Sequence, residues 1–549
     1  MRHRRRRVLQ GRILLFGLAV LICPSLSASQ QEGAITADQA IDKIIAKENE
    51  LIKKLTEFRP LVETYIQNLA KDESLGAVPI SDKYFLSRLD VKAGLRGQSM
   101  LDRPGEKKFH LNRTVVFEPD GFASMIVIDA KGFTRSNYTF RFLRREFLGD
   151  VRCLIFDIAP VKRQAGRFTG RIWVEDQDFN IVRFNGIHGP PPKLGDPLLW
   201  FHCDSWRQNA GPNLWLPSYV YSEETEDPKL NFKAQTRLWG YNVQERTDLN
   251  EFTAVLVDSG TVRDAPEAVQ DVSPLMATRA WQQQAEDNII RRIEETGLFA
   301  APGAVNTILE TVIRNLEITN NLDVQPEVRT RVLLTSPLES FTIGHTIVIS
   351  RGLIDVLPDE ASLASVLAHE LAHIVSGHNP NTKYAFSDSL LFDDVETLRK
   401  IFVRRDEREE AQADAKAAEL LEKSPYKERL KDAGLFLRAM SDRIRFLPEL
   451  LRPHLGNSMV RGSEVVRLAG IMQAAPEVEL KRRDQIAALP LGARLRLNPW
   501  NNTISMASPT TAPLNSQREK MSFEITPVFL HLTRERDEES GPRDASKLP

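Results

Sequence analysis

The spacing of apolar residues changes along the chain, and the first regular stretch has a helical period. From about residue 34 to 72, apolar side chains recur every three or four positions among lysines and glutamates, with Pro60 as the one break. This period predicts an amphipathic helical segment. We expect it to pack on a neighbouring domain, with binding of a partner as the alternative.

Between about residues 83 and 255 the period shortens. Short runs rich in Phe, Val, Ile, Tyr and Trp alternate with turn sequences. Such runs predict strands, and their close spacing predicts a meandering antiparallel sheet. The clearest predicted strands are residues 138–143, 151–158, 170–174 and 214–221. Residues 170–174 and 180–184 resemble strands in the curved sheets of periplasmic lipoprotein carriers.

Helical spacing returns near residue 275, and glycines at 297 and 303 bracket a hinge before the next domain. Together these patterns predict a multidomain α+β protein with a helical N-terminal segment, an antiparallel sheet domain and a mainly helical domain with a small edge sheet. The expected divisions are 1–28 leader, 29–80 amphipathic segment, 81–265 β-rich domain, 266–303 helical linker, 304–425 catalytic domain, 426–535 helical and β extension and 536–549 disordered tail.

The first 28 residues have the layout of a secretory signal peptide. Six arginines precede an apolar run of about eleven residues, which is shorter than the roughly 20 needed to cross a bilayer. The Arg5-Arg6-Arg7 run resembles a twin-arginine signal, and Cys23 raises lipidation as an alternative. We expect an exported, periplasmic protein with no transmembrane helix after the leader; peripheral membrane association and an uncleaved anchor are alternatives.

Charge and cysteine content bear on the possible partners of the protein and on its disulfide bonding. Residues 1–28 hold six of the 73 basic residues and none of the 74 acidic ones, so the remaining chain carries a formal charge of −7. That charge argues against nucleic acid as a partner, because such proteins present a basic surface. Beyond the leader, Cys153 and Cys203 are the remaining cysteines, and they form either a disulfide or two buried thiols.

The strongest chemical signal is His369-Glu370-Leu371-Ala372-His373. Asp359 is a plausible N-cap and Gly377 a plausible end, which predicts a helix of about 17 residues. Positions i and i+4 lie roughly 40° apart around a helix, so both imidazoles face one point. This arrangement predicts a zinc site in which Glu370 takes a proton from water.

A third ligand is predicted downstream. Glu410 and Asp414 are four residues apart on an alanine-rich helix, whose small side chains allow close approach. Glu410 would complete a His-His-Glu site, and Asp414 would orient one of the histidines. The alternative for both carboxylates is a solvated charged face.

These residues resemble a known family. The run Ser350 to Ile354, the segment Leu363 to His373, then His378, and finally Glu410 to Asp414 are similar to the HtpX-like and CAAX-prenyl-endopeptidase family of zinc metallopeptidases, peptidase family M48. The resemblance spans about residues 306–421. It implies a zincin-type endopeptidase with one zinc per chain, held by His369, His373 and Glu410, with Glu370 as general base and Asp414 in support.

The resemblance is incomplete in two places. Relatives often carry Asn-Ala-Phe before the strand that leads to the helix, and here Leu338-Glu339-Ser340-Phe341 stands instead. The frequent later His-Pro and Arg have no clear counterpart; His454 and Arg461 are candidates to stabilise the oxyanion, with structural roles as the alternative.

Three neighbouring features leave alternatives open. Residues 346–350 form a β-branched run that is either an edge strand able to pair with substrate or an internal strand. His345 is expected in a surface or turn role. His378 is expected to be structural or to support a ligand, because catalytic zinc keeps one position open.

The leading hypothesis is a zinc-dependent metalloendopeptidase that cleaves unfolded or misassembled exported proteins in envelope quality control. One rival is a binding or assembly factor, chaperone-like or handling lipoproteins, in which the protease domain is vestigial or regulatory. Another is a purely structural zinc, which fits poorly beside Glu370.

Overall fold

The structure, a computed structural model, covers much but not all of the chain. It describes residues 35–73, 76–92, 95–101, 109–110, 116–117, 122–162, 164, 166–189, 202–224, 231–241, 274–378, 405–452, 454–456, 460–461, 464–465, 468–473, 475–477, 495–497 and 503–506. The predicted leader with its arginine pair and Cys23, and the predicted tail at 536–549, lie outside these ranges.

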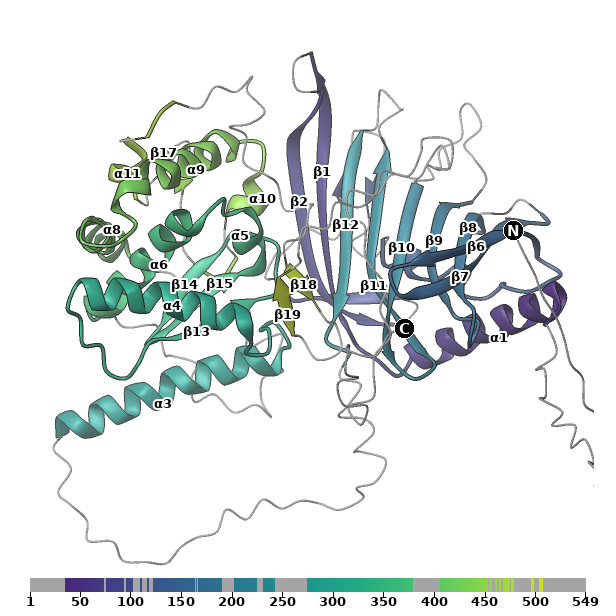
Figure 1. Ribbon diagram of the computed structural model, residues 1–549, viewed down its shortest axis with the longest axis horizontal. Helices are drawn as coiled ribbons and strands as arrows, with labels where there is room; N and C mark the ends of the chain where they lie inside the picture. The colour runs from purple at the N-terminus through teal and green to yellow at the C-terminus, as the bar shows by residue number, and fades with distance from the viewer. Residues whose placement is uncertain are drawn as a thin grey trace, which may run out of the picture.

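A ten-stranded antiparallel sheet dominates the first half, as predicted (Figure 1). Its spatial order is β3-β2-β1-β12-β11-β10-β9-β8-β7-β6, so most neighbours in space are neighbours in sequence. The strands are β1 (Leu61–Asp72), β2 (Gly76–Asp90), β3 (Arg96–Ser99), β6 (Tyr138–Leu148), β7 (Val151–Pro160), β8 (Phe168–Glu175), β9 (Ile181–His188), β10 (His202–Gly211), β11 (Leu214–Glu224) and β12 (Phe232–Trp239). The four clearest predicted strands correspond to β6, β7, β8 and β11.

The N-terminal helix is shorter than predicted. Helix α1 (Ala37–Leu55) begins with a capping box between Thr36 and Gln39, and strand β1 follows Pro60. The prediction of helix to residue 72, and of a sheet domain starting at 81, is therefore wrong. Strand β1 is buried on both faces, because Val62 belongs to one core cluster and Tyr65 to another. A strand buried on both sides lacks the alternation of period two, so its apolar spacing imitated a helix.

The two cysteines are free and lie on opposite faces of the sheet. Cys203 on β10 packs in the core between the sheet, α1 and the 3-10 helix η1 (Phe122–Ile126), while Cys153 on β7 packs in the core of the other face. Strands β8 and β9 lie between β7 and β10. Three strand spacings amount to roughly 14 Å, far beyond disulfide reach. The disulfide alternative is wrong, and both residues are buried thiols.

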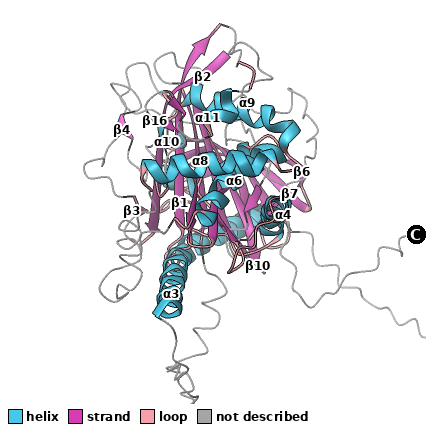
Figure 2. Cartoon of the chain, turned by 90° about the vertical axis from the view of Figure 1, so that its left-hand side faces the viewer, coloured by secondary structure: helices cyan, strands magenta, loops and turns pink. Residues whose placement is uncertain are grey.

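The second half is mainly helical. Figure 2 shows helices α4, α6, α8 and α9 in front of the strands. The helices are α3 (Pro274–Glu295), α4 (Ala304–Thr319), α5 (Arg351–Val356), α6 (Glu360–Val375), α8 (Glu407–Glu422), η2 (Lys427–Arg429), α9 (Leu430–Arg443), α10 (Pro448–Leu451) and α11 (Ala469–Gln473). None of the helices in the described ranges has both the length and the apolar composition that a membrane span requires.

Short strands complete this half. A three-stranded sheet has the order β13 (Arg329–Leu333), β15 (Thr346–Ser350), β14 (Ser340–Ile343). Its middle strand is β15, so the edge-strand alternative for residues 346–350 is wrong and the internal one is right. Two-stranded pairs are β4 (Phe109–His110) with β5 (Val116–Phe117), β16 (Val460–Arg461) with β17 (Glu464–Val465), and β18 (Leu495–Leu497) with β19 (Ile504–Met506).

The two halves share one hydrophobic core. Leu61, Tyr65 and Tyr84 from strands β1 and β2 are buried in the same cluster as the apolar residues of α4 and α6. Polar contacts reinforce this junction: the Asp82 carboxylate accepts the backbone N–H groups of Glu449 at 3.0 Å and Leu450 at 2.9 Å. The sheet therefore supports the helical half directly.

Candidate metal centre

Helix α6 carries the two histidines of the motif. Asp359 caps its N-terminus by accepting the backbone N–H of Ser362 at 2.8 Å, and the helix ends at Val375, before Gly377 at a φ of 70°. These boundaries match the predicted helix. His369 and His373 are one turn apart and almost wholly buried, with 2% and 1% of their surfaces exposed.

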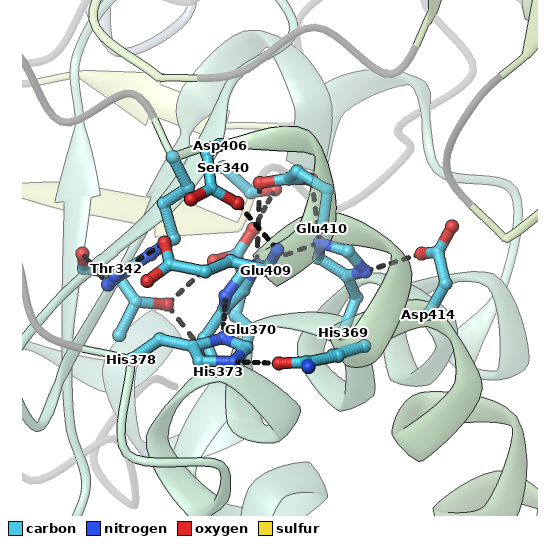
Figure 3. A network of polar contacts seen from close by, with 12 residues as sticks. Ser340, Thr342, His369, Glu370, His373, His378, Asp406, Glu409, Glu410 and Asp414 are labelled. Carbon is cyan, nitrogen blue, oxygen red and sulfur yellow. Dashed lines mark hydrogen bonds and ion pairs between the residues drawn. The ribbon is translucent and has the colours of Figure 1, made fainter.

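Helix α8 brings the carboxylates to this point. Asp406 caps it by accepting the N–H groups of Arg408 and Glu409, both at 2.9 Å. Ala413 and Ala417 are fully buried on the side that packs against α6. Their small side chains let the two helices approach closely, which places Glu410 opposite the histidines (Figure 3).

Two ring nitrogens and the two oxygens of one carboxylate converge with the spacing of a tetrahedral metal site. Nε2 of His369 lies 3.2 Å from Nε2 of His373 and 3.3 Å from Oε2 of Glu410, and Nε2 of His373 lies 3.5 Å from Oε1 of Glu410. Ligands at roughly 2.0–2.1 Å from a tetrahedral zinc would be about 3.4 Å apart. The donor set and its spacing therefore fit zinc.

The outer ring nitrogens of both histidines have polar neighbours that favour the ligating tautomer. Nδ1 of His369 lies 2.8 Å from Oδ1 of Asp414, and Nδ1 of His373 lies 2.8 Å from Nδ1 of His378. Nε2 of His378 in turn lies 3.1 Å from Oε1 of Gln412. Protons at Nδ1 of His373 and at Nε2 of His378 satisfy the contacts with His378 and Gln412, and Asp414 is the charged neighbour of Nδ1 of His369. The Nε2 atoms of both histidines then carry lone pairs within 3.5 Å of the Glu410 carboxylate.

This arrangement brings the Nε2 lone pairs of His369 and His373 close to the carboxylate of Glu410. Burial lowers the pKa of His373, although Glu410 acts in the opposite direction. A neutral imidazole is the form that binds a metal. Two buried imidazoles and a partly exposed carboxylate that face one another are suited to sharing a cation, so these three residues could hold a metal ion.

Glu370 lies next to the cluster and is held from the small sheet. Its Oε1 accepts the hydroxyl of Ser340 at 2.7 Å, and its Oε2 accepts the hydroxyl of Thr342 at 2.6 Å. Sequence reasoning missed both residues and treated this segment only as a departure from a familiar motif. The alternation Ser340-Phe341-Thr342-Ile343 was the available signal, since it puts two hydroxyls on one face of a strand.

The remaining candidates have contacts of other kinds. The ring of His454 stacks on Tyr84 with centroids 5.0 Å apart, and its backbone N–H donates to Glu339. Arg461 belongs to strand β16, and its side chain lies outside the described part of the chain. The oxyanion role of both residues stays a prediction. His345 lies in a turn, and its Nδ1 is 3.7 Å from Oε2 of Glu286.

Comparison with known protein families gives a match over the part of the chain that contains the cluster. The sequence model of peptidase family M48 matches residues 304–454, which include all three candidate ligands and Glu370. A search of curated proteins found no match.

Solved structures match the chain over a little more than a third of its length. A LolA superfamily protein from Nitrosomonas europaea has 12% identity and a TM-score of 0.20, covering 36% of this chain and 91% of its own. A DUF1329 family protein from Desulfovibrio piger has 13% identity and a TM-score of 0.21, with 38% and 93% covered. MucB, solved in complex with MucA, has 8% identity and a TM-score of 0.13, with 37% and 94% covered.

Proposed function

Residues 304–454 are a domain of peptidase family M48, and from this premise we propose that the protein is a zinc-dependent metalloendopeptidase. The observation that carries the proposal is the convergence of His369, His373 and Glu410, whose ligand atoms all lie within 4.8 Å of one another, beside the buried carboxylate of Glu370. A structural zinc would have no use for that carboxylate.

Each residue has a distinct role in the proposed reaction. His369, His373 and Glu410 hold the metal, while Asp414 and His378 keep the two imidazoles in the ligating tautomer. Bound zinc would supply Lewis acidity towards the scissile carbonyl and an attacking water. Glu370 takes the proton from that water and passes it to the leaving amine.

The proposed substrates are peptide segments of exported proteins, in particular unfolded or misassembled envelope proteins. Two features support this class. The first 28 residues have the pattern of an export signal. In addition, β14 is one of the two outer strands of the small sheet as far as the described residues show, and it lies next to Glu370. An extended, unfolded chain can pair with such a strand through its backbone, whatever its sequence.

The rival hypothesis of a binding or assembly factor has less support. Strands β1 and β2 share a hydrophobic core with the peptidase domain, so this part of the sheet is committed to supporting the catalytic half. If the sheet alone served binding of cargo, a peptidase inactivated at Glu370 would keep the protein's function in cells.

The test is cleavage of casein by the purified protein and by Glu370→Gln. Glutamine keeps the size of the side chain but cannot accept the proton, so we expect cleavage to fall by at least about a thousandfold while zinc stays bound. Retained cleavage in the variant would refute the role of Glu370. Zinc without cleavage in the unaltered protein would refute general endopeptidase activity.

A further inference from the structure

Two hydroxyls on one face of strand β14 hold the catalytic carboxylate (Figure 3). We propose that Ser340 and Thr342 are positioning residues that fix the orientation of Glu370 for proton transfer. This inference rests on the proposed peptidase function and adds to it a pair of residues from outside the zinc-binding helices.

The geometry assigns one donor to each carboxylate oxygen. Ser340 donates to Oε1 at 2.7 Å and Thr342 to Oε2 at 2.6 Å, and the Thr342 hydroxyl also lies 3.3 Å from the carbonyl oxygen of Glu370. An ionised carboxylate has no proton to give, so both hydroxyls must donate. Hydrogen bonds to a charged acceptor are shorter and stronger than those between neutral groups, and both of these hydrogen bonds are short.

Two donors are needed because one does not fix the group. The last torsion of a glutamate side chain is broad, so a carboxylate held at one oxygen still rotates about that bond. A second donor on the other oxygen prevents this rotation. Ser340 and Thr342 are two residues apart in a strand, and such residues point to the same face with a fixed separation.

Strand β14 is itself held firmly. The backbone N–H of Glu339 donates to the Ser350 hydroxyl at 3.0 Å, and the N–H of Ser350 donates to the carbonyl of Glu339 at 2.8 Å. On the outer side, Arg405 donates to the carbonyl of Thr342 at 3.1 Å. The intervening Phe341 and Ile343 are buried in the main core. The two hydroxyls therefore have little freedom to move with Glu370.

A purely structural role is the alternative to be excluded. Ser340 and Thr342 are 5% and 1% exposed, and buried hydroxyls need a partner of some kind. The two roles differ in what a substitution changes. Loss of positioning lowers kcat with little change in KM, because Glu370 acts on the water rather than on substrate binding. Loss of packing lowers stability and leaves the kinetics of the folded fraction unchanged.

The experiment uses the complete zinc-loaded protein with a quenched fluorescent casein peptide as substrate. The variants are Ser340→Ala, Thr342→Val and the double variant, with Thr342→Ser to restore a hydroxyl. The matched control is Thr346→Val in the neighbouring strand β15. Thr346 is 1% exposed, and its hydroxyl has no hydrogen-bond partner among the residues that the structure describes. We would measure kcat, KM, zinc content and thermal midpoint for each.

We expect kcat to fall several-fold in each single variant and about 100-fold in the double variant, at unchanged KM and zinc content. Thr342→Ser should recover most of the Thr342→Val loss, and Thr346→Val should keep the original kcat. If the unaltered protein cleaves in a Glu370-dependent manner but the double variant keeps its kcat, the positioning role is overturned and the peptidase function stands. If the unaltered protein does not cleave, both fail.

Discussion

Two buried polar clusters in this protein differ in how their donors and acceptors are balanced. In the interface cluster, Glu63 of β1 accepts Arg351 at 3.0 Å, the Ser336 hydroxyl at 2.8 Å and the Tyr84 hydroxyl at 2.9 Å. In the metal cluster, formed by His369, His373 and Glu410, lone pairs and a carboxylate face one another.

The difference shows what burial of polar groups does and does not indicate. Both clusters are largely buried and both contain charge. In the interface cluster each carboxylate oxygen of Glu63 meets a donor, although Nη1 of Arg351 has no hydrogen-bond partner among the described residues. In the metal cluster an added cation would satisfy the acceptors that face one another. An imbalance of acceptors, rather than burial or a shifted pKa, therefore distinguishes the proposed metal site from the structural cluster.

The largest effect on stability is expected from the interface cluster. Arg351→Met removes the guanidinium that donates to the buried Glu63 carboxylate and leaves Arg237 as its cationic neighbour, so the protein should be destabilised by about 3 kcal/mol. The folded fraction should keep its zinc, because Arg351 is not one of the residues of the metal cluster. Urea unfolding and metal analysis would check both.

A companion variant sharpens this result. Adding Glu63→Gln to Arg351→Met removes the negative charge of the buried carboxylate. The glutamine keeps an amide oxygen for Ser336 and Tyr84, so part of the lost stability should return. Loss of zinc in the single variant, or an unchanged unfolding midpoint, would mean that the two clusters are not separate in the way described.

Substitution of Asp414 or His378, which contact the outer nitrogens of the two histidines, should have a smaller effect, and that effect should be on metal affinity rather than on stability. Removing the partner of a ligating histidine typically costs 10–100-fold in metal affinity, so we expect that range for Asp414→Ala and for His378→Phe. Competition with a chelator would measure it. Glu419→Gln, an exposed position on the same helix, is the control and should leave the affinity unchanged. Equal losses in all three variants would argue against specific support.

The smallest effect expected is a pH dependence at the junction of the two halves. Burial raises the pKa of Asp82 to about 6, above its ordinary value of 3.8, although two backbone N–H groups act in the opposite direction. Folding therefore favours the protonated form. Its contribution to stability is fully present below about pH 4 and is lost as the pH rises through 6.

The measurement is the unfolding midpoint between pH 4 and 7 for the unaltered protein and for Asp82→Asn. The difference between the two proteins should change across this window, with the unaltered one losing stability relative to the variant as the pH rises. A constant difference would show that Asp82 titrates normally.

The sequence predicted the convergence of His369, His373 and Glu410 better than the surroundings of these residues, for a physical reason. His369 and His373 are linked by the geometry of a single helix, which is a local property, and the same holds for Glu410 and Asp414 on α8. Their meeting across two helices could be inferred because small alanines accompany the second pair. In contrast, Ser340 and Thr342 reach Glu370 from a strand about 30 residues earlier, and no local pattern specifies that contact.

The fold was also predictable only in part. Strands β6 to β8 and β11 have clear turn boundaries and aromatic or β-branched residues, and they were found. Strand β1 was mistaken for helix because both of its faces are buried against different cores. The order of β13, β15 and β14 depends on long-range pairing, so the sequence alone left β15 as either edge or centre.

We propose above that a metal completes the cluster of His369, His373 and Glu410. The most direct test is metal analysis of the purified protein beside Glu410→Ala and the interface variant Arg351→Met. We expect one zinc per chain in the unaltered protein and in folded Arg351→Met, and a large loss of zinc in Glu410→Ala. A protein without zinc, or equal zinc content in Glu410→Ala, would contradict it.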